Sequence, residues 1–151
     1  MVVTSIITTL VGQELLSETG KSIYNGITGV LTHDNPIITR ILDELDVIAS
    51  LKIIQSLITD IKSYHYETKT FQIALEFIND ITKKINDEVD KINIEEREHN
   101  DKWFASWRTP IYLKRIKHLK LLKQNMDKRF DYIVKIIKIN NDLMEIENNN
   151  K

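Results

Sequence analysis

Apolar residues recur every seven positions in the middle of the chain, and this spacing constrains the fold more than any other feature. Two turns of an α-helix take about seven residues, so such a repeat keeps one side of a helix apolar. The pattern predicts a long helix from about Lys69 to Trp103 that packs along one side. Its residues are Phe71, Ile78, Ile85 and Ile92, with Ala74 and Ile81 between them.

The C-terminal third predicts a second long amphipathic helix. Thr109 stands before Pro110, and a threonine cap followed by proline at the first helical position is typical of a helix start. Basic residues fill the face opposite the apolar one, so this helix needs neighbours to cover its apolar side. The predicted buried seam consists of Ile116, Leu119, Met126, Phe130, Ile133 and Ile137, with Lys123 as an interruption and Leu122 beside it.

Two earlier segments also have helical periodicity. Residues 4–31 hold all four glycines of the chain, each costing about 1 kcal/mol relative to alanine inside a helix. This segment is therefore either the least stable helix or is broken near Gly20. We attribute the glycines to close approach of a neighbouring helix, and the alternative is a segment that loosens to enter a membrane.

Asn35 and Pro36 mark the next helix start, as a cap and a first helical residue. Residues 37–64 then predict one helix with a wide apolar stripe. The many isoleucines could suggest a strand, but apolar and polar residues do not alternate there.

Short turns near residues 32–36, 64–69 and 103–110 require neighbouring helices to run antiparallel. We therefore predict an all-α fold, an antiparallel up-down-up-down four-helix bundle with long helices. The chain of 151 residues suits one core. We expect a single domain over residues 1–147 and a disordered tail at 148–151.

The charge is distributed unevenly along the chain. Residues 34–100 hold eight Lys and Arg against fourteen Asp and Glu, whereas residues 101–139 hold eleven against three. The basic helix either lies beside acidic neighbours in its own fold or faces an anionic partner. We favour the first interpretation, because it needs nothing outside the chain.

The motifs of several enzyme classes are missing from the sequence. The absence of cysteine excludes a disulfide scaffold, cysteine-ligated zinc and a cysteine nucleophile. Glu96 and His99 have the Glu-x-x-His spacing of di-iron bundles, but no second such pair exists in the chain. Zincin, nucleotide-binding and hydrolase motifs are also absent. We predict a protein that is not an enzyme and has no cofactor or metal.

The third predicted turn contains an aromatic cluster, Trp103, Phe104 and Trp107. These rings either cover the apolar core at the open end of the bundle or form an exposed contact beside Arg108. We expect a protein partner or a second copy of the chain, with an anionic membrane surface as the alternative. Nucleic acid is not expected, because the pI is near 6.4 and no known binding module is present. The candidate interaction residues are Trp103, Phe104, Trp107, Arg108, Lys114, Lys117 and Lys120.

Two resemblances add to this interpretation. MVVTSIITTLVGQELLSETGKSIYNGITGVL resembles the start of HeLo-type and mixed-lineage-kinase-like four-helix bundles in its glycine-containing amphipathic helix, which implies membrane perturbation in cell death. HNDKWFASWRTPIYLKRIKHL and NMDKRFDYIVKII resemble uncharacterised helical proteins of large DNA viruses, a likeness that implies no activity.

The N-terminus has no basic leader and its apolar run is short, so neither a secretory signal nor a membrane span is indicated. We expect a cytoplasmic protein, in a host cell or a virion if viral. The predicted function is a non-enzymatic structural or protein-interaction bundle. The alternative is a membrane-active bundle that engages anionic lipid through its first helix and its basic fourth helix.

Overall fold

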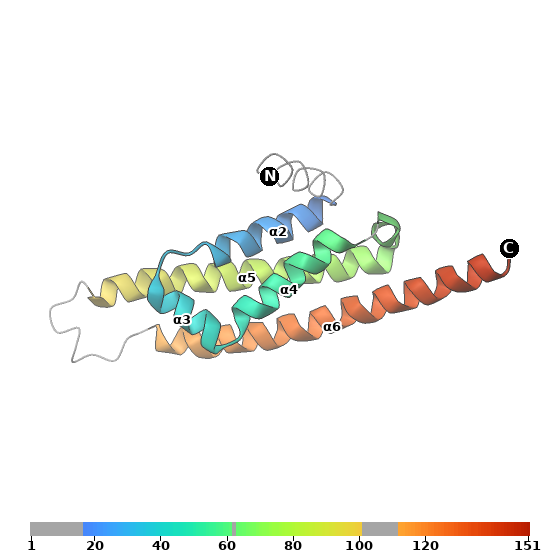
Figure 1. Cartoon of the computed structure of the whole chain (residues 1–151). Coiled ribbons are helices and arrows are strands. Elements are labelled where there is room, and N and C mark those ends of the chain that lie inside the picture. Colours follow the sequence, from blue (N-terminus) through green and yellow to red (C-terminus); the bar gives the residue numbers. More distant parts are fainter. Residues whose placement is uncertain (1–16, 62, 101–111) are drawn as a thin grey trace.

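The computed structural model describes residues 17–61, 63–100 and 112–151, and every regular element in these ranges is helical. The described residues form five α-helices and a short 3₁₀ helix, η1 (Ser63–Glu67), and Figure 1 shows how the α-helices are arranged. The all-α prediction is confirmed, but the number of helices in the described residues differs from four. The α-helices are α2 (Glu18–Leu31), α3 (Pro36–Glu44), α4 (Val47–Asp60), α5 (Lys69–Asn100) and α6 (Leu113–Asn149).

Helix α5 lies between α2 and α6 and contacts both (Figure 1). It runs parallel to α2, because Gly26 faces Thr82 and Gly29, further along α2, faces Asn86 further along α5. It runs antiparallel to α6: the start of α6 meets the end of α5, and later residues of α6 meet earlier ones of α5. This central position explains why the strongest apolar repeat of the sequence belongs to α5.

The seven-residue repeat of α5 forms the middle of the core. Phe71, Ile78 and Ile85 have no exposed surface, and Ile92 has 1%. Glu88 occupies a position of the repeat at which an apolar residue is expected. Both Glu88 and its neighbour Val89 are buried. The predicted seam of α6 is confirmed in its middle, where Leu119, Leu122, Met126 and Ile133 are buried, while Ile116, Phe130 and Ile137 are partly buried against the core.

Helix α2 begins at Glu18 and includes Gly20, so the expectation of one continuous helix from residue 4 to Leu31 fails at Ser17, which is not helical. Ser17 has extended backbone, and its side-chain oxygen accepts a hydrogen bond from the Gly20 amide at 3.0 Å. Such a cap satisfies an amide of the first turn that has no partner within the helix. Residues 4–16 of the predicted helix lie outside the described residues.

Gly26 lets α2 approach α5 closely, as the sequence predicted. A Cβ at this position would lie 3.2 Å from Cγ2 of Thr82, a residue with no exposed surface whose hydroxyl donates to the Ile78 carbonyl. Gly29 has more room, since its nearest neighbours, two side-chain atoms of Asn86, would be 3.9 Å from a Cβ.

Replacing Gly29 by alanine is therefore expected to raise the free energy of unfolding by about 0.5–1 kcal/mol, because alanine loses less backbone entropy in a helix. Gly26→Ala is the matched control. It should gain less or lose stability, since the buried Thr82 has to move. Urea unfolding of both variants measures the difference, and equal effects would contradict the close approach at Gly26.

The prediction of one helix over residues 37–64 was wrong. The structure has two helices there, α3 and α4. Asn35 caps α3 as predicted, its side chain accepting from the amides of Ile37 and Ile38. The helix ends where Asp46 takes a left-handed conformation with φ of 59°. Aspartate tolerates this region better than most side chains do. In Figure 1, α3 descends from the end of α2 towards α6, and α4 returns obliquely towards η1.

The turn between α4 and α5 packs aromatic rings against the core. The Tyr66 hydroxyl donates to the Ile58 carbonyl at 3.2 Å, and its ring lies edge-on to Phe71 with centroids 5.5 Å apart. Burial raises the pKa of Tyr66 to about 12. His65 is 3% exposed beside the same Phe71 ring, and burial lowers its pKa below the ordinary 6.5.

The free energy of unfolding is expected to fall as the pH is lowered from about 7 to about 5, in part because of His65. Its depressed pKa means that the unfolded chain takes up a proton first, so acid favours unfolding. The contribution is fully present above pH 6.5 and declines below it. A His65→Gln variant should show a shallower decline in chemical denaturation, and an unchanged slope would contradict this role.

Helix α6 begins at Leu113, later than the predicted start at Pro110; Thr109 and Pro110 themselves lie outside the described residues. It continues to Asn149, slightly beyond the predicted limit near Glu147. Its last turns extend past the start of α5 (Figure 1). Among the helices that the structure describes, none combines the length and hydropathy that crossing a bilayer requires.

Candidate interaction surface

The basic residues of α6 divide into two sets, one facing α5 and one facing away. In the first set, Nε of Arg115 lies 2.7 Å from Glu95 and Nη1 lies 3.3 Å from Glu88. The Nδ1 of His118 lies 3.0 Å from the other oxygen of Glu88. These contacts agree with the interpretation that acidic neighbours in the fold balance part of the basic helix.

Glu88 is the buried centre of this charge cluster, with 4% of its side chain exposed, against 33% for Arg115 and 54% for His118. The hydrogen bond to Glu95, followed by the one to Glu88, raises the pKa of the Arg115 guanidinium. A hollow of about 320 Å³ is lined by Glu88, Glu95, Lys114, Arg115 and His118. Because Arg115 of α6 donates hydrogen bonds to both carboxylates of α5, the cluster can join the two helices at this end.

A second charged contact lies further along the same helix pair. Arg129 donates to the Phe77 carbonyl at 2.7 Å and to Asp80 at 3.1 Å, and its guanidinium lies 5.6 Å from the centre of the Phe77 ring. Hydrogen bonds from Lys84 and Arg129 lower the pKa of Asp80. Both groups of contacts fix the antiparallel register of α5 and α6.

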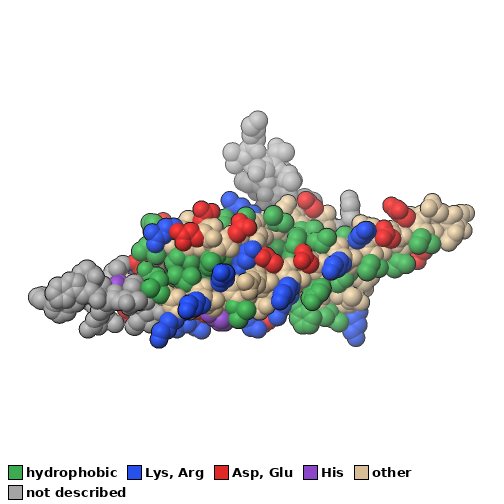
Figure 2. Space-filling model, turned by 90° about the horizontal axis from the view of Figure 1, so that it is seen from below, with side chains coloured by type: hydrophobic (Ala, Val, Ile, Leu, Met, Phe, Trp, Pro, Cys, Tyr) green, Lys and Arg blue, Asp and Glu red, His purple; other side chains and the backbone are tan. Residues whose placement is uncertain are grey.

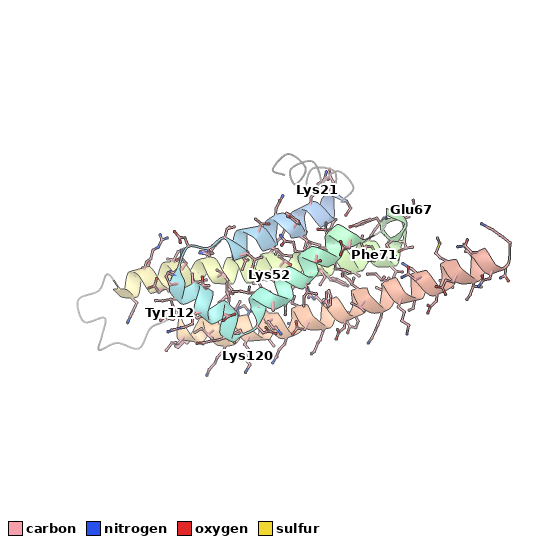
Figure 3. The ribbon with its side chains drawn as sticks, in the orientation of Figure 1. Lys21, Lys52, Glu67, Phe71, Tyr112 and Lys120 are labelled. Carbon is pink, nitrogen blue, oxygen red and sulfur yellow. The ribbon has the colours of Figure 1, made fainter. Side chains whose placement is uncertain are left out.

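The predicted candidates Lys114, Lys117 and Lys120 are all exposed. Lys117 and Lys120 belong to the second set, whereas Lys114 lines the hollow beside Glu88 and Glu95. In Figure 3, Lys120 projects from α6 away from the rest of the molecule. None of the ion pairs between described residues involves these three lysines. Figure 2, which views the α6 side, shows basic side chains spaced along the helix with hydrophobic ones between them. The other candidates, Trp103, Phe104, Trp107 and Arg108, lie outside the described residues.

The structure reveals an exposed apolar stripe on α6 that the sequence interpretation missed. We call Tyr132, Ile136, Ile139, Leu143 and Ile146 the α6 stripe. Tyr132 and Ile139 are each 57% exposed, Leu143 is 55% and Ile146 is 56%, while Ile136 is partly buried. Their spacing of four and three residues was visible in the sequence, but the neighbouring Ile133 and Ile137 had been assigned to the buried seam. On α5, Ile73 and Phe77 are also exposed.

The far end of the stripe lies where α6 leaves its neighbours. Because Arg129 is level with Phe77 and Asp80 in an antiparallel pair, Asn140 is level with the first residue of α5. A hollow of about 260 Å³ is lined there by Glu67 and Thr68 together with the α6 residues Asn140, Leu143, Met144 and Glu147. No helix in the described ranges covers the outer side of α6 here, so the stripe is open to a partner.

Glu96 and His99 do not form part of a metal site in the described ranges. Glu96 is 6% exposed and accepts a hydrogen bond from the Asn35 side chain at 3.1 Å. Within the described residues, no three histidine or acidic side chains come together in a way that could hold a metal ion. The contact with Asn35 instead connects the α3 cap to α5.

Comparison of the chain with protein-family models, with curated proteins and with solved structures finds no match. The two resemblances noted in the sequence therefore stay predictions, and the function has to be argued from the residues.

Proposed function

We propose that this protein is a non-enzymatic helical protein that binds a protein partner through the exposed side of α6. The observation that supports this most is the α6 stripe. Four of its five side chains are more than half exposed on one side of one helix. Contiguous apolar surface of this kind is typical of protein interfaces, whereas isolated exposed apolar residues are ordinary.

The proposal includes the arrangement of the helices. We propose that α3 and α4 together take the place of the second helix in an up-down-up-down bundle. The parallel pair α2 and α5 and the antiparallel pair α5 and α6 support this order. In such an arrangement α6 is the last helix and has one side left for a partner.

Catalysis is not part of the proposal. The hollow beside His118 has the polar lining that an enzyme site would need, but Arg115 within it already donates hydrogen bonds to both Glu88 and Glu95. Such closed ion pairs are better suited to holding two helices together than to binding a substrate.

A photo-crosslinking amino acid placed at position 139 tests the proposal in cells of the native source. Crosslinks to a protein, either another protein or a second copy, are expected at position 139. Ile53 on α4 offers a matched control, because its exposed fraction is the same 57% as that of Ile139 but no stripe surrounds it. Equal crosslinking at both positions, or none at 139, would count against an α6 interface.

A second candidate function is binding to an anionic lipid surface, which the exposed Lys114, Lys117 and Lys120 favour. Co-sedimentation with phosphatidylserine vesicles, compared with neutral phosphatidylcholine vesicles, tests it. Binding to the anionic vesicles that weakens with added salt would support this function. Absence of binding with the protein folded would remove it.

A further inference from the structure

The α6 stripe has the spacing of a surface on which two helices pair. Its residues are separated by four, three, four and three positions, the repeat that keeps one side of a helix against another over about two heptads. The core holds the first half of the stripe, where Ile133 is buried and Ile136 and Ile137 are partly buried. This part of α6 is therefore already helical before a partner binds, so pairing loses less conformational entropy than it would with a disordered segment.

Charges beside the stripe select the direction of a partner helix. Lys135 and Asp142 are seven residues apart on the same flank of the stripe, and Glu147 lies on the other flank. Two antiparallel copies of α6 bring Lys135 of each copy beside Asp142 of the other. Two parallel copies instead bring Asp142 of each copy beside Glu147 of the other, which is repulsive.

We propose, on the basis of the proposed function, that the partner of the α6 stripe is a second copy of this chain, paired antiparallel about a two-fold axis. In this register Ile136 packs against Ile139 of the second copy, and Tyr132 packs against its Leu143. Ile146 then reaches the Arg129 and Phe77 region of the second copy. This register uses the exposed Phe77 as well as the stripe and gives two Lys135–Asp142 pairs.

The interface is small, so the dimer should be weak. Five stripe residues and Phe77 on each copy are far fewer than the roughly 20–30 residues a side of a typical stable interface, so we expect less buried surface. We expect a dissociation constant on the order of 1–100 µM. Each copy offers the same patch to the other, so the association closes at two copies.

Sedimentation velocity of the purified full chain over roughly 5–500 µM tests the pairing. The apparent mass should rise with concentration from 17.7 kDa toward twice that value. Ile139→Asp places a charge in the stripe and should abolish the rise, whereas the equally exposed Ile53→Asp on α4 should leave it unchanged. Circular dichroism checks that both variants keep their helices.

Charge exchange tests the direction. Lys135→Glu and Asp142→Lys should each weaken the dimer by about tenfold, and the double variant should restore it, because its pairs are again opposite in sign. A parallel pair would respond differently: Asp142→Lys would then strengthen the dimer by removing the repulsion from Glu147. Such strengthening would overturn the antiparallel arrangement.

A monomer at every concentration would overturn pairing with a second copy. In that case a crosslink from position 139 to a different protein would leave the proposed function standing. Absence of any crosslink at position 139 would remove the proposed function as well, so the two failures are distinguishable.

Discussion

Replacing Ile85 by alanine is expected to lower the free energy of unfolding by about 2–5 kcal/mol. Ile85 has no exposed surface and occupies the middle of the seven-residue repeat of α5. Truncation removes buried methyl groups and leaves a cavity, because the surrounding helices cannot fully close around it. A loss of this size is a large part of the stability of an ordinary domain. Urea unfolding followed by circular dichroism measures it.

Ile94 is the matched control, since it belongs to the same helix and is 54% exposed. Ile94→Ala should change the free energy of unfolding by no more than about 0.5 kcal/mol, as surface substitutions usually do. If the two variants were equally stable, Ile85 would not lie in the core, and the central position of α5 would be wrong.

Replacing Arg115 by methionine is expected to cost about 2–4 kcal/mol, the second largest effect. Methionine keeps much of the alkyl chain but removes the charge between Glu88 and Glu95. Glu88 is then a nearly buried carboxylate that has lost its main cation, and it stands near a second carboxylate. The penalty is below that of a fully buried pair, because a third of Arg115 is exposed to water.

Glu88→Leu should cost much less than Arg115→Met, about 1 kcal/mol or less. The reason is an asymmetry of burial: without Glu88, the cations of Arg115 and His118 can still reach water. The double variant should be more stable than Arg115→Met alone, since no buried carboxylate remains in the centre of the cluster. Chemical denaturation of the three variants gives the comparison, and equal costs for the two single variants would contradict the asymmetry.

The division of the predicted second helix could have been found in the sequence. Ile38, Ile41 and Leu42 of α3 are buried, and so are Val47, Leu51, Ile54 and Ile58 of α4. On one continuous helix these two sets would point about half a turn apart. The wide apolar stripe predicted for residues 37–64 was therefore two narrower stripes out of phase, and the left-handed Asp46 resets the phase between them.

The charge cluster and the α6 stripe could not be assigned from sequence in the same way. Glu88 interrupts an apolar repeat, and its partners Arg115 and His118 are 27 and 30 positions away along the chain. Pairing them requires the register between α5 and α6. Likewise, the 4-3-4-3 spacing from Tyr132 to Ile146 does not reveal exposure, because a second apolar stripe on the same helix faces the core.

By itself, the sequence determined the helical class, the long α5, the Asn35 cap and the turn before Pro36, because these depend on local periodicity and local backbone chemistry. Only the tertiary structure decided which lysines and arginines of α6 meet carboxylates and which of its apolar sides stays uncovered. Those outcomes depend on the rotation and offset of α5 against α6, which are set by the packing of both helices together and are not encoded in the pattern of either one.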